Sequence, residues 1–139
     1  MKTTIRILVA VAAAFLVANA ASAQNAGREA LLARGRYLVE NVGMCADCHS
    51  PRDQRGAFVA GKELTGAPLA FAPTVPMPAW GGVAPAIAGL PTMTEAEAVK
   101  FFQTGLRPSG TVPLPPMPSF RFNEADATAI AAYLKSLGK

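Results

Sequence analysis

The chain has 139 residues, which is enough for one domain and barely enough for two. Hydrophobic residues make up 51% of it and charged residues only 16%, whereas about a quarter of an average soluble chain is charged. This composition excludes a disordered polyelectrolyte. The 13 Lys and Arg are not clustered, so we expect no nucleic-acid partner. Two Cys and one His exclude both a disulfide-dense scaffold and a multi-histidine metal centre.

The first part of the chain has the layout of a secretory signal peptide, which we assign to residues 1–23. A start with two basic residues precedes an apolar run at 7–18, and the small residues ASA end the segment. The run is too short for a bilayer, which needs about 20 apolar residues. We therefore predict cleavage after Ala23 and a single exported, periplasmic domain at 24–139, with no membrane span in the mature chain.

Residues 28–42 are the first predicted helix of the mature chain. Leu31 and Leu38 recur at near-helical intervals with charged residues between them, and Gly43 supplies the stop. Gly35 interrupts this pattern, where glycine costs about 1 kcal/mol relative to alanine. It is either a tolerated imperfection or a position where another segment packs against the backbone.

Residues 45–49 read CADCH, the C-x-x-C-H signature of covalent c-type haem attachment. Cys45 and Cys48 lie about one helical turn apart, so each thiol can add to one of two neighbouring vinyl groups of the porphyrin. His49 then presents its imidazole to the iron as the proximal ligand. The sequence therefore predicts one covalently attached haem c.

Three other uses of this motif are weaker. A structural zinc site needs four Cys or His ligands, and the chain has three such residues in total. A thioredoxin-like C-x-x-C needs a βαβ pattern, which is missing, and a plain disulfide gives His49 no role. Beyond the motif, Arg52 is suited equally to pairing with a haem propionate and to a solvated surface.

All but one of the 12 prolines lie between residues 68 and 118, which predicts long loops there. Apolar side chains in these loops, such as Phe71 and Trp80, must pack on something, and a large apolar ligand answers that need. Trp80 has an indole N–H that suits a propionate, but we favour plain packing.

Two further helices follow. A capping box, Thr94 to Glu97, predicts a helix that Gly105 ends, and Asn123 opens a last helix with an apolar stripe. Strand signals are weak throughout. The predicted fold class is all-α: three or more helices and Pro-rich loops around one haem.

A methionine is the remaining strong candidate for the sixth iron position, since there is no second His. Met44 adjoins the attachment cysteines, and Met93 suits an apolar contact beside the capping box. Met77 and Met117 remain open, each flanked by prolines that stiffen the loop.

Four segments then resemble a class I bacterial cytochrome c: CADCHSPR, the Thr-Gly pair at 104–105, PPMPSF at 115–120 and the final DATAIAAYLKSL. The closest similarity is to small cytochrome domains and subunits that accept electrons from periplasmic or membrane-bound dehydrogenases. The resemblance covers most of residues 27–137. The segment at 71–90, with its extra Pro-Met-Pro, departs from short members of the family.

The resemblance implies that Met117 is the axial ligand and that the first and last helices cross. In that crossing Gly35 and Tyr37 meet the region of Tyr133 and Leu134. With both axial positions filled, the haem would carry single electrons between Fe(III) and Fe(II).

We therefore expect a non-enzymatic electron-transfer protein, or an electron-transfer subunit, with a dehydrogenase as donor and a respiratory acceptor downstream. The alternatives are a haem enzyme or gas sensor with a labile sixth ligand, and a C-x-x-C module without haem.

Overall fold

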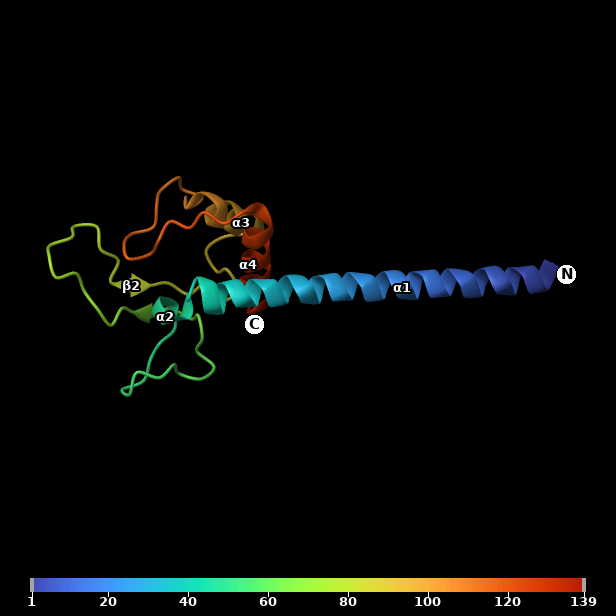
Figure 1. Ribbon diagram of the computed structural model, residues 1–139, viewed down its shortest axis with the longest axis horizontal. Helices are drawn as coiled ribbons and strands as arrows, with labels where there is room; N and C mark the ends of the chain where they lie inside the picture. Colours follow the sequence, from blue (N-terminus) through green and yellow to red (C-terminus); the bar gives the residue numbers. More distant parts are fainter. Residues whose placement is uncertain (1, 139) are drawn as a thin grey trace. The chain divides into compact units, whose positions relative to one another are not determined.

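The computed structural model describes the backbone of residues 2–138 and the side chains of residue 19 and residues 21–138. The chain divides into two compact units, Met1–Leu31 and Leu32–Lys139. The elements in order are α1 (Lys2–Tyr37), the π-helical turn η1 (Leu38–Val42), α2 (Ala46–His49), β1 (Ala67–Pro68), β2 (Val83–Ala84), α3 (Glu95–Thr104) and α4 (Glu124–Ser136) (Figure 1). The fold is all-α, as predicted, with one two-stranded ladder.

The helix predicted at 28–42 ends where expected but does not begin there. Helix α1 runs without a break from Lys2 into Tyr37, because no proline lies between the apolar run and Arg28 and Gly27 alone does not end the helix. The predicted start at residue 28 was therefore wrong. The predicted signal peptide covers residues 1–23. Met1 and most of the side chains of this segment lie outside the described part of the structure. In the part of the chain that the structure describes, no helix is both long and apolar enough to cross a bilayer.

Helix α3 begins and ends at the predicted residues. The Thr94 hydroxyl accepts from the Glu97 backbone N–H at 3.2 Å, and the Glu97 carboxylate accepts from the Thr94 N–H at 2.8 Å. Gly105 ends the helix at a φ of 71°, a conformation that favours glycine. Helix α4 is capped by the Asn123 side chain, which accepts from the Asp126 N–H at 2.9 Å. The capping motifs thus fix both helices locally.

The core of the second unit forms where α4 packs against α3 and η1 (Figure 1). Helix α4 contributes mostly small buried residues, with Leu134 fully buried. Its backbone comes so close to α1 that a Cβ on Gly35 would collide with the Ala129 carbonyl oxygen and lie 2.6 Å from the Tyr133 Cβ. The predicted meeting of Gly35 with the last helix is confirmed. Tyr37, in contrast, is half exposed, and its ring lies beneath Arg34.

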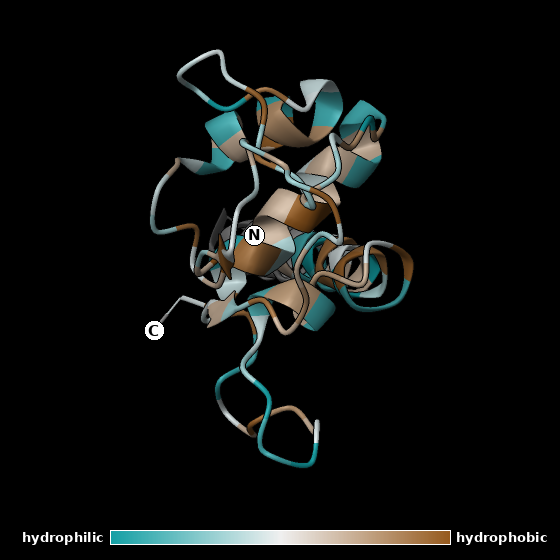
Figure 2. Ribbon diagram, turned by 90° about the vertical axis from the view of Figure 1, so that its left-hand side faces the viewer, coloured by the Kyte–Doolittle hydropathy of each residue, from teal (hydrophilic) through white to brown (hydrophobic). Residues whose placement is uncertain are grey.

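The proline-rich middle of the chain forms loops, as predicted. Strands β1 and β2 pair antiparallel, Ala67 with Ala84 and Pro68 with Val83, and close the loop 69–82. This loop extends away from the helices (Figure 1). The other protruding loop, residues 51–63 after α2, is mostly hydrophilic (Figure 2).

Candidate functional site

A cavity of about 600 Å³ opens within the second unit, a size typical of ligand pockets. The walls come from α2, β2, α3 and α4 and from the two proline-rich loops, residues 69–82 and 106–122. They are mostly apolar. The lining residues that matter below are Met44, Cys45, Cys48, His49, Val83, Met93, Arg107, Leu114, Met117 and Phe120. Both thiols and the imidazole of the CADCH motif therefore open into one apolar space.

His49 is buried at the end of α2, and its ring is fixed by a single hydrogen bond. The Nδ1–H donates to the Pro85 carbonyl at 2.7 Å, and because a carbonyl only accepts, the proton must sit on Nδ1. Burial lowers the pKa of His49, although the bond to Pro85 partly opposes this. The lowered pKa favours the neutral imidazole, whose lone pair then lies on Nε2, and this is the form that binds a metal.

The two cysteines lie on consecutive turns at the cavity wall and are not joined in a disulfide. Cys45 follows Met44, whose φ of 46° turns the chain from η1 into α2. Burial raises the pKa of the Cys45 thiol to about 11, so this thiol is protonated at neutral pH. Gly43 lies beside this thiol, and a Cβ at Gly43 would come within 3.2 Å of the Cys45 Sγ.

The CADCH turn is held in place by the chain that follows it. The Gly66 N–H donates to the His49 carbonyl at 2.7 Å, and the Leu64 N–H donates to the buried Ser50 hydroxyl oxygen at 2.9 Å. Gly66 has a φ of 88°, and a Cβ there would lie 2.8 Å from the Ala86 N. Only glycine fits this position, which brings the segment carrying the Pro85 carbonyl up to His49.

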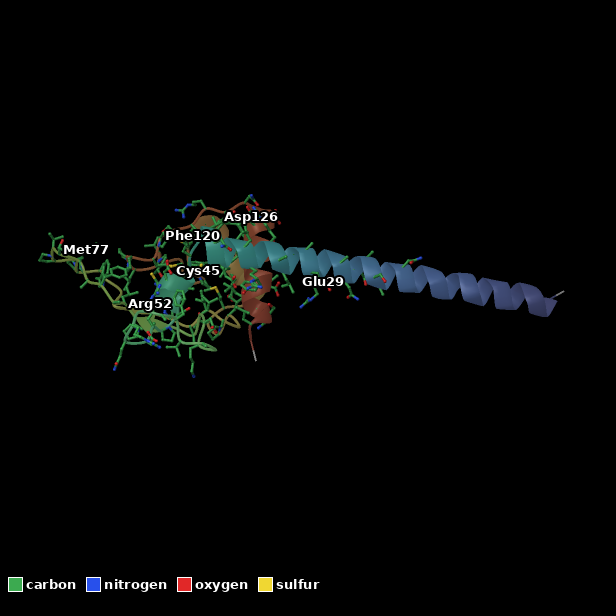
Figure 3. The ribbon with its side chains drawn as sticks, turned by 60° about the horizontal axis from the view of Figure 1, so that its bottom comes forward. Glu29, Cys45, Arg52, Met77, Phe120 and Asp126 are labelled. Carbon is green, nitrogen blue, oxygen red and sulfur yellow. The ribbon has the colours of Figure 1, made fainter. Side chains whose placement is uncertain are left out.

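The structure separates the two methionines that the loop pattern left open. Met117 lines the cavity, whereas Met77 does not. Met77 lies at the tip of the loop 69–82, away from Cys45 (Figure 3). Phe120, in contrast, lies close to Cys45. Met44 and Met93 also line the cavity, which the sequence pattern did not reveal.

A tight turn presents Met117. Its N–H donates to the Leu114 carbonyl at 3.1 Å across Pro115 and Pro116, whose peptide bond is cis. The Pro115 carbonyl accepts from the Gly81 N–H at 2.7 Å. The two proline-rich loops are therefore tied together beside the cavity.

Arg52 and Trp80 lie outside the cavity wall. Arg52 donates to Asp47 at 3.0 Å and to the Gly56 carbonyl at 2.8 Å, and its guanidinium lies 4.0 Å from the centre of the Phe58 ring. Of the two roles left open for Arg52, these contacts fit the one at the surface, because Arg52 does not line the cavity. Trp80 packs edge-on against Phe71, with ring centres 5.8 Å apart.

Besides two methionines of the cavity wall, sequence reasoning missed two polar groups at the site. The Pro85 carbonyl is a backbone atom, and no residue pattern announces its contact with His49. Arg107 lines the cavity, and it is the only charged residue between Lys100 and Arg121. The sequence signal that could have revealed Arg107 is a single charged residue in an otherwise apolar, proline-rich segment.

These residues fit a haem group on the evidence of the structure itself. Two free thiols, at the spacing of the haem attachment motif, line an apolar cavity of about 600 Å³. The buried His49 imidazole has its Nδ1 already hydrogen-bonded to a carbonyl, which leaves Nε2 for a metal. A buried histidine whose other N–H is held by a carbonyl is the usual arrangement of a metal ligand. Fold and site together define a haem-binding, all-α domain.

Comparison with protein families agrees with this class. A family model described as Cytochrome c matches residues 32–138, which is almost the whole second unit. The chain therefore belongs to the cytochrome c family, whose members bind covalently attached haem c and transfer electrons with it. No curated protein matches the chain.

Proposed function

We propose that the protein is a monohaem electron carrier in which Cys45 and Cys48 hold the haem and His49 and Met117 are the axial ligands. The observation that carries this proposal is the hydrogen bond from His49 Nδ1 to the Pro85 carbonyl, which leaves Nε2 for iron. The haem supplies one-electron chemistry between Fe(III) and Fe(II). A His and Met ligand pair raises the reduction potential.

The chain's own residues orient the cofactor and exclude water. Pro85 fixes the His49 ring, and Gly66 holds the turn that carries it. Phe120 and Leu134 supply apolar wall on the side of α4 and the loop before it. Low polarity around iron favours the less charged ferrous state, so the apolar wall works in the same direction as a methionine ligand.

Electrons would enter and leave at the exposed rim of the cavity. Met44, Val83 and Leu114 line the cavity and are 57%, 68% and 46% exposed. These three uncharged side chains suit brief contact with a redox partner over a small area. We propose a dehydrogenase as the electron donor and a respiratory component as the acceptor, with the protein free or as a subunit of an oxidoreductase complex.

We further propose that residues 1–23 are removed on export and that the mature protein works in the periplasm. Support comes from the basic start, the apolar run and the small residues before Gln24. Mass spectrometry of the protein from its native host tests this. A chain that begins at Gln24 and carries one haem is expected, whereas a retained N-terminus would contradict the cleavage.

Visible spectra of three variants test the ligand assignment: Met117→Leu, Met93→Leu and Met77→Leu. All three retain apolar bulk, so loss of iron ligation is the main change. We expect only Met117→Leu to lose the methionine-to-iron band of the ferric protein and to show a lower reduction potential. Met77→Leu is the matched control, because this residue also lies in a Pro-Met-Pro segment but outside the cavity.

Loss of that band in Met93→Leu instead would reassign the ligand and leave the electron-carrier function intact. Rapid carbon monoxide binding by the ferrous wild-type protein would argue for an open or labile sixth position. That outcome would contradict the proposal and favour a haem enzyme or gas sensor.

A further inference from the structure

Among the described residues that line the cavity, Arg107 is the only charged one. It lies in the loop between α3 and Met117, at the exposed edge of the cavity. Every other contribution to that wall is apolar or uncharged. Because Arg107 is exposed at this edge, its guanidinium stays in contact with water and can still meet an anionic group held in the cavity.

The loop around Arg107 is closed by its own backbone. The Arg107 N–H donates to the Thr111 carbonyl and the Gly110 N–H to the Arg107 carbonyl, both at 2.8 Å. The base of the Arg107 side chain is thereby fixed beside the cavity. The hydrogen bonds of the loop therefore determine where Arg107 lies.

The Arg107 guanidinium has donors to spare. One N–H donates to the Val112 carbonyl at 3.2 Å, while the group carries five N–H donors in all. Within residues 19 and 21–138 it has no ion pair. Glu97 lines a small neighbouring hollow together with Arg107, but its carboxylate accepts from the N–H and hydroxyl of Thr94 in the capping box.

The other arginines near the site are already committed. Arg52 pairs with Asp47 outside the cavity, and Arg121 donates to the Ser119 and Phe120 carbonyls, also outside the wall. Arg107 is thus the one described cation that both reaches the cavity and lacks a carboxylate.

We propose that Arg107 binds a haem propionate and so positions the cofactor in the cavity. This inference rests on the proposed haem binding. Haem carries two carboxylates on one edge, and an ionised carboxylate needs either water or a cation. A planar guanidinium at the rim supplies charge and paired N–H donors in the geometry that carboxylates prefer.

The pairing has a measurable consequence for iron. A positive charge near the haem opposes oxidation, so its removal stabilises the ferric state. For Arg107→Gln we expect the ferrous-to-ferric ratio at a fixed electrode potential to fall by roughly threefold or more at low ionic strength. Arg107→Lys keeps the charge and should restore most of that ratio.

The experiment compares holoproteins of wild type, Arg107→Gln, Arg107→Lys and the matched control Arg52→Gln. Two properties are measured: the reduction potential, and the bending mode of the haem carboxylate in resonance Raman spectra. We expect Arg107→Gln to lower the potential and shift the mode. Arg107→Lys should shift the mode with little change of potential, and Arg52→Gln should match wild type in both.

A carboxylate mode and a potential that stay at wild-type values in Arg107→Gln would overturn the proposal. So would Arg52→Gln causing the shifts instead. If Arg107→Gln does not accumulate as holoprotein, Arg107→Lys decides by the Raman mode alone. Wild-type protein that carries no covalent haem would refute the proposed function itself, before any variant is compared.

Discussion

At position 35, the absence of a side chain lets two helices meet. Gly35 lies in α1, where alanine would favour the helix by about 1 kcal/mol. The Ala129 carbonyl and the Tyr133 Cβ occupy the space that a Cβ would need. Packing between helices therefore outweighs local helix propensity at this residue.

We expect Gly35→Ala to destabilise the holoprotein by about 1–3 kcal/mol, because α1 and α4 must move apart to admit the methyl group. Denaturant unfolding followed by haem absorbance measures the change. Gly27→Ala is the matched control, since it lies in the same helix with no atom within 4 Å. Equal stabilities of the two variants would show that the close approach is unimportant.

At the scale of elements, the crossing of η1 and α4 is held by one contact at its solvent-exposed edge. The Tyr133 hydroxyl donates to Glu40 Oε1 at 2.7 Å, and Arg36 donates to the other oxygen at 3.0 Å. Burial and then the bond to Glu40 raise the pKa of Tyr133 to about 12. For Glu40, burial acts to raise the pKa, but the bonds from Tyr133 and Arg36 outweigh it and the pKa is lowered.

These two shifts define a pH window for the crossing. The raised pKa of Tyr133 gives stability that is complete below its ordinary value of 10.0 and is lost as the pH rises through about 12. The lowered pKa of Glu40 gives stability that is complete above its ordinary value of 4.5 and is lost as the pH falls below it. The contact is thus at full strength between these limits.

We expect Tyr133→Phe to lower stability at neutral pH by about 1 kcal/mol and to remove the alkaline part of the dependence. Carbon-13 labelling of the two tyrosine rings and NMR titration provide the measurement. Wild type should show one ring, that of Tyr133, whose titration is delayed to about 12. In Tyr133→Phe this delayed signal should be absent, and its persistence would contradict the assignment.

For the whole molecule, the cofactor takes the place of a core. The cavity of about 600 Å³ is bounded by α4, α3 and two loops that have few regular hydrogen bonds of their own. Apolar walls that face an unfilled cavity lose packing contacts, and such a loss is large beside the small net stability of a typical domain. The second unit therefore depends on haem for its packing.

We expect the chain without attached haem to be poorly folded. Near-UV circular dichroism should be weak and side-chain NMR signals broad, while part of the helix signal in the far-UV persists. The holoprotein under the same conditions is the control. Sharp, dispersed side-chain signals from haem-free chain would show that the helices and loops pack without the cofactor.

The exposed apolar residues of the rim, Met44, Val83 and Leu114, also predict how the whole molecule meets its oxidants. The rate of oxidation by ferricyanide should vary only weakly with salt, because these three residues bring no charge and the propionate that we propose for Arg107 balances its charge. Val83→Lys adds one cation there and should raise the rate several-fold at low salt, with the gain lost at high salt. A steep salt dependence in wild type would place electron exchange at another, charged surface.

Much of this protein is determined by sequence alone, because the signals are local. Thr94 with Glu97 and Asn123 with Asp126 cap helices within four residues, and CADCH places two thiols and an imidazole within one turn. The proline positions fix which segments are loops, since proline removes a donor and restricts φ. These features follow from neighbours in the chain and need no knowledge of the fold.

Other features were decided only by tertiary structure, because they join residues far apart in the chain. Pro85 holds His49 through a backbone oxygen, Arg107 rather than Arg52 reaches the cavity, and Met93 lies in the same wall as Met117. The sequence pattern also did not predict that α1 is continuous, because the one indication of it is the absence of a strong helix breaker before Arg28. Spacing along the chain determines which groups are available, whereas packing determines which of them face the same cavity.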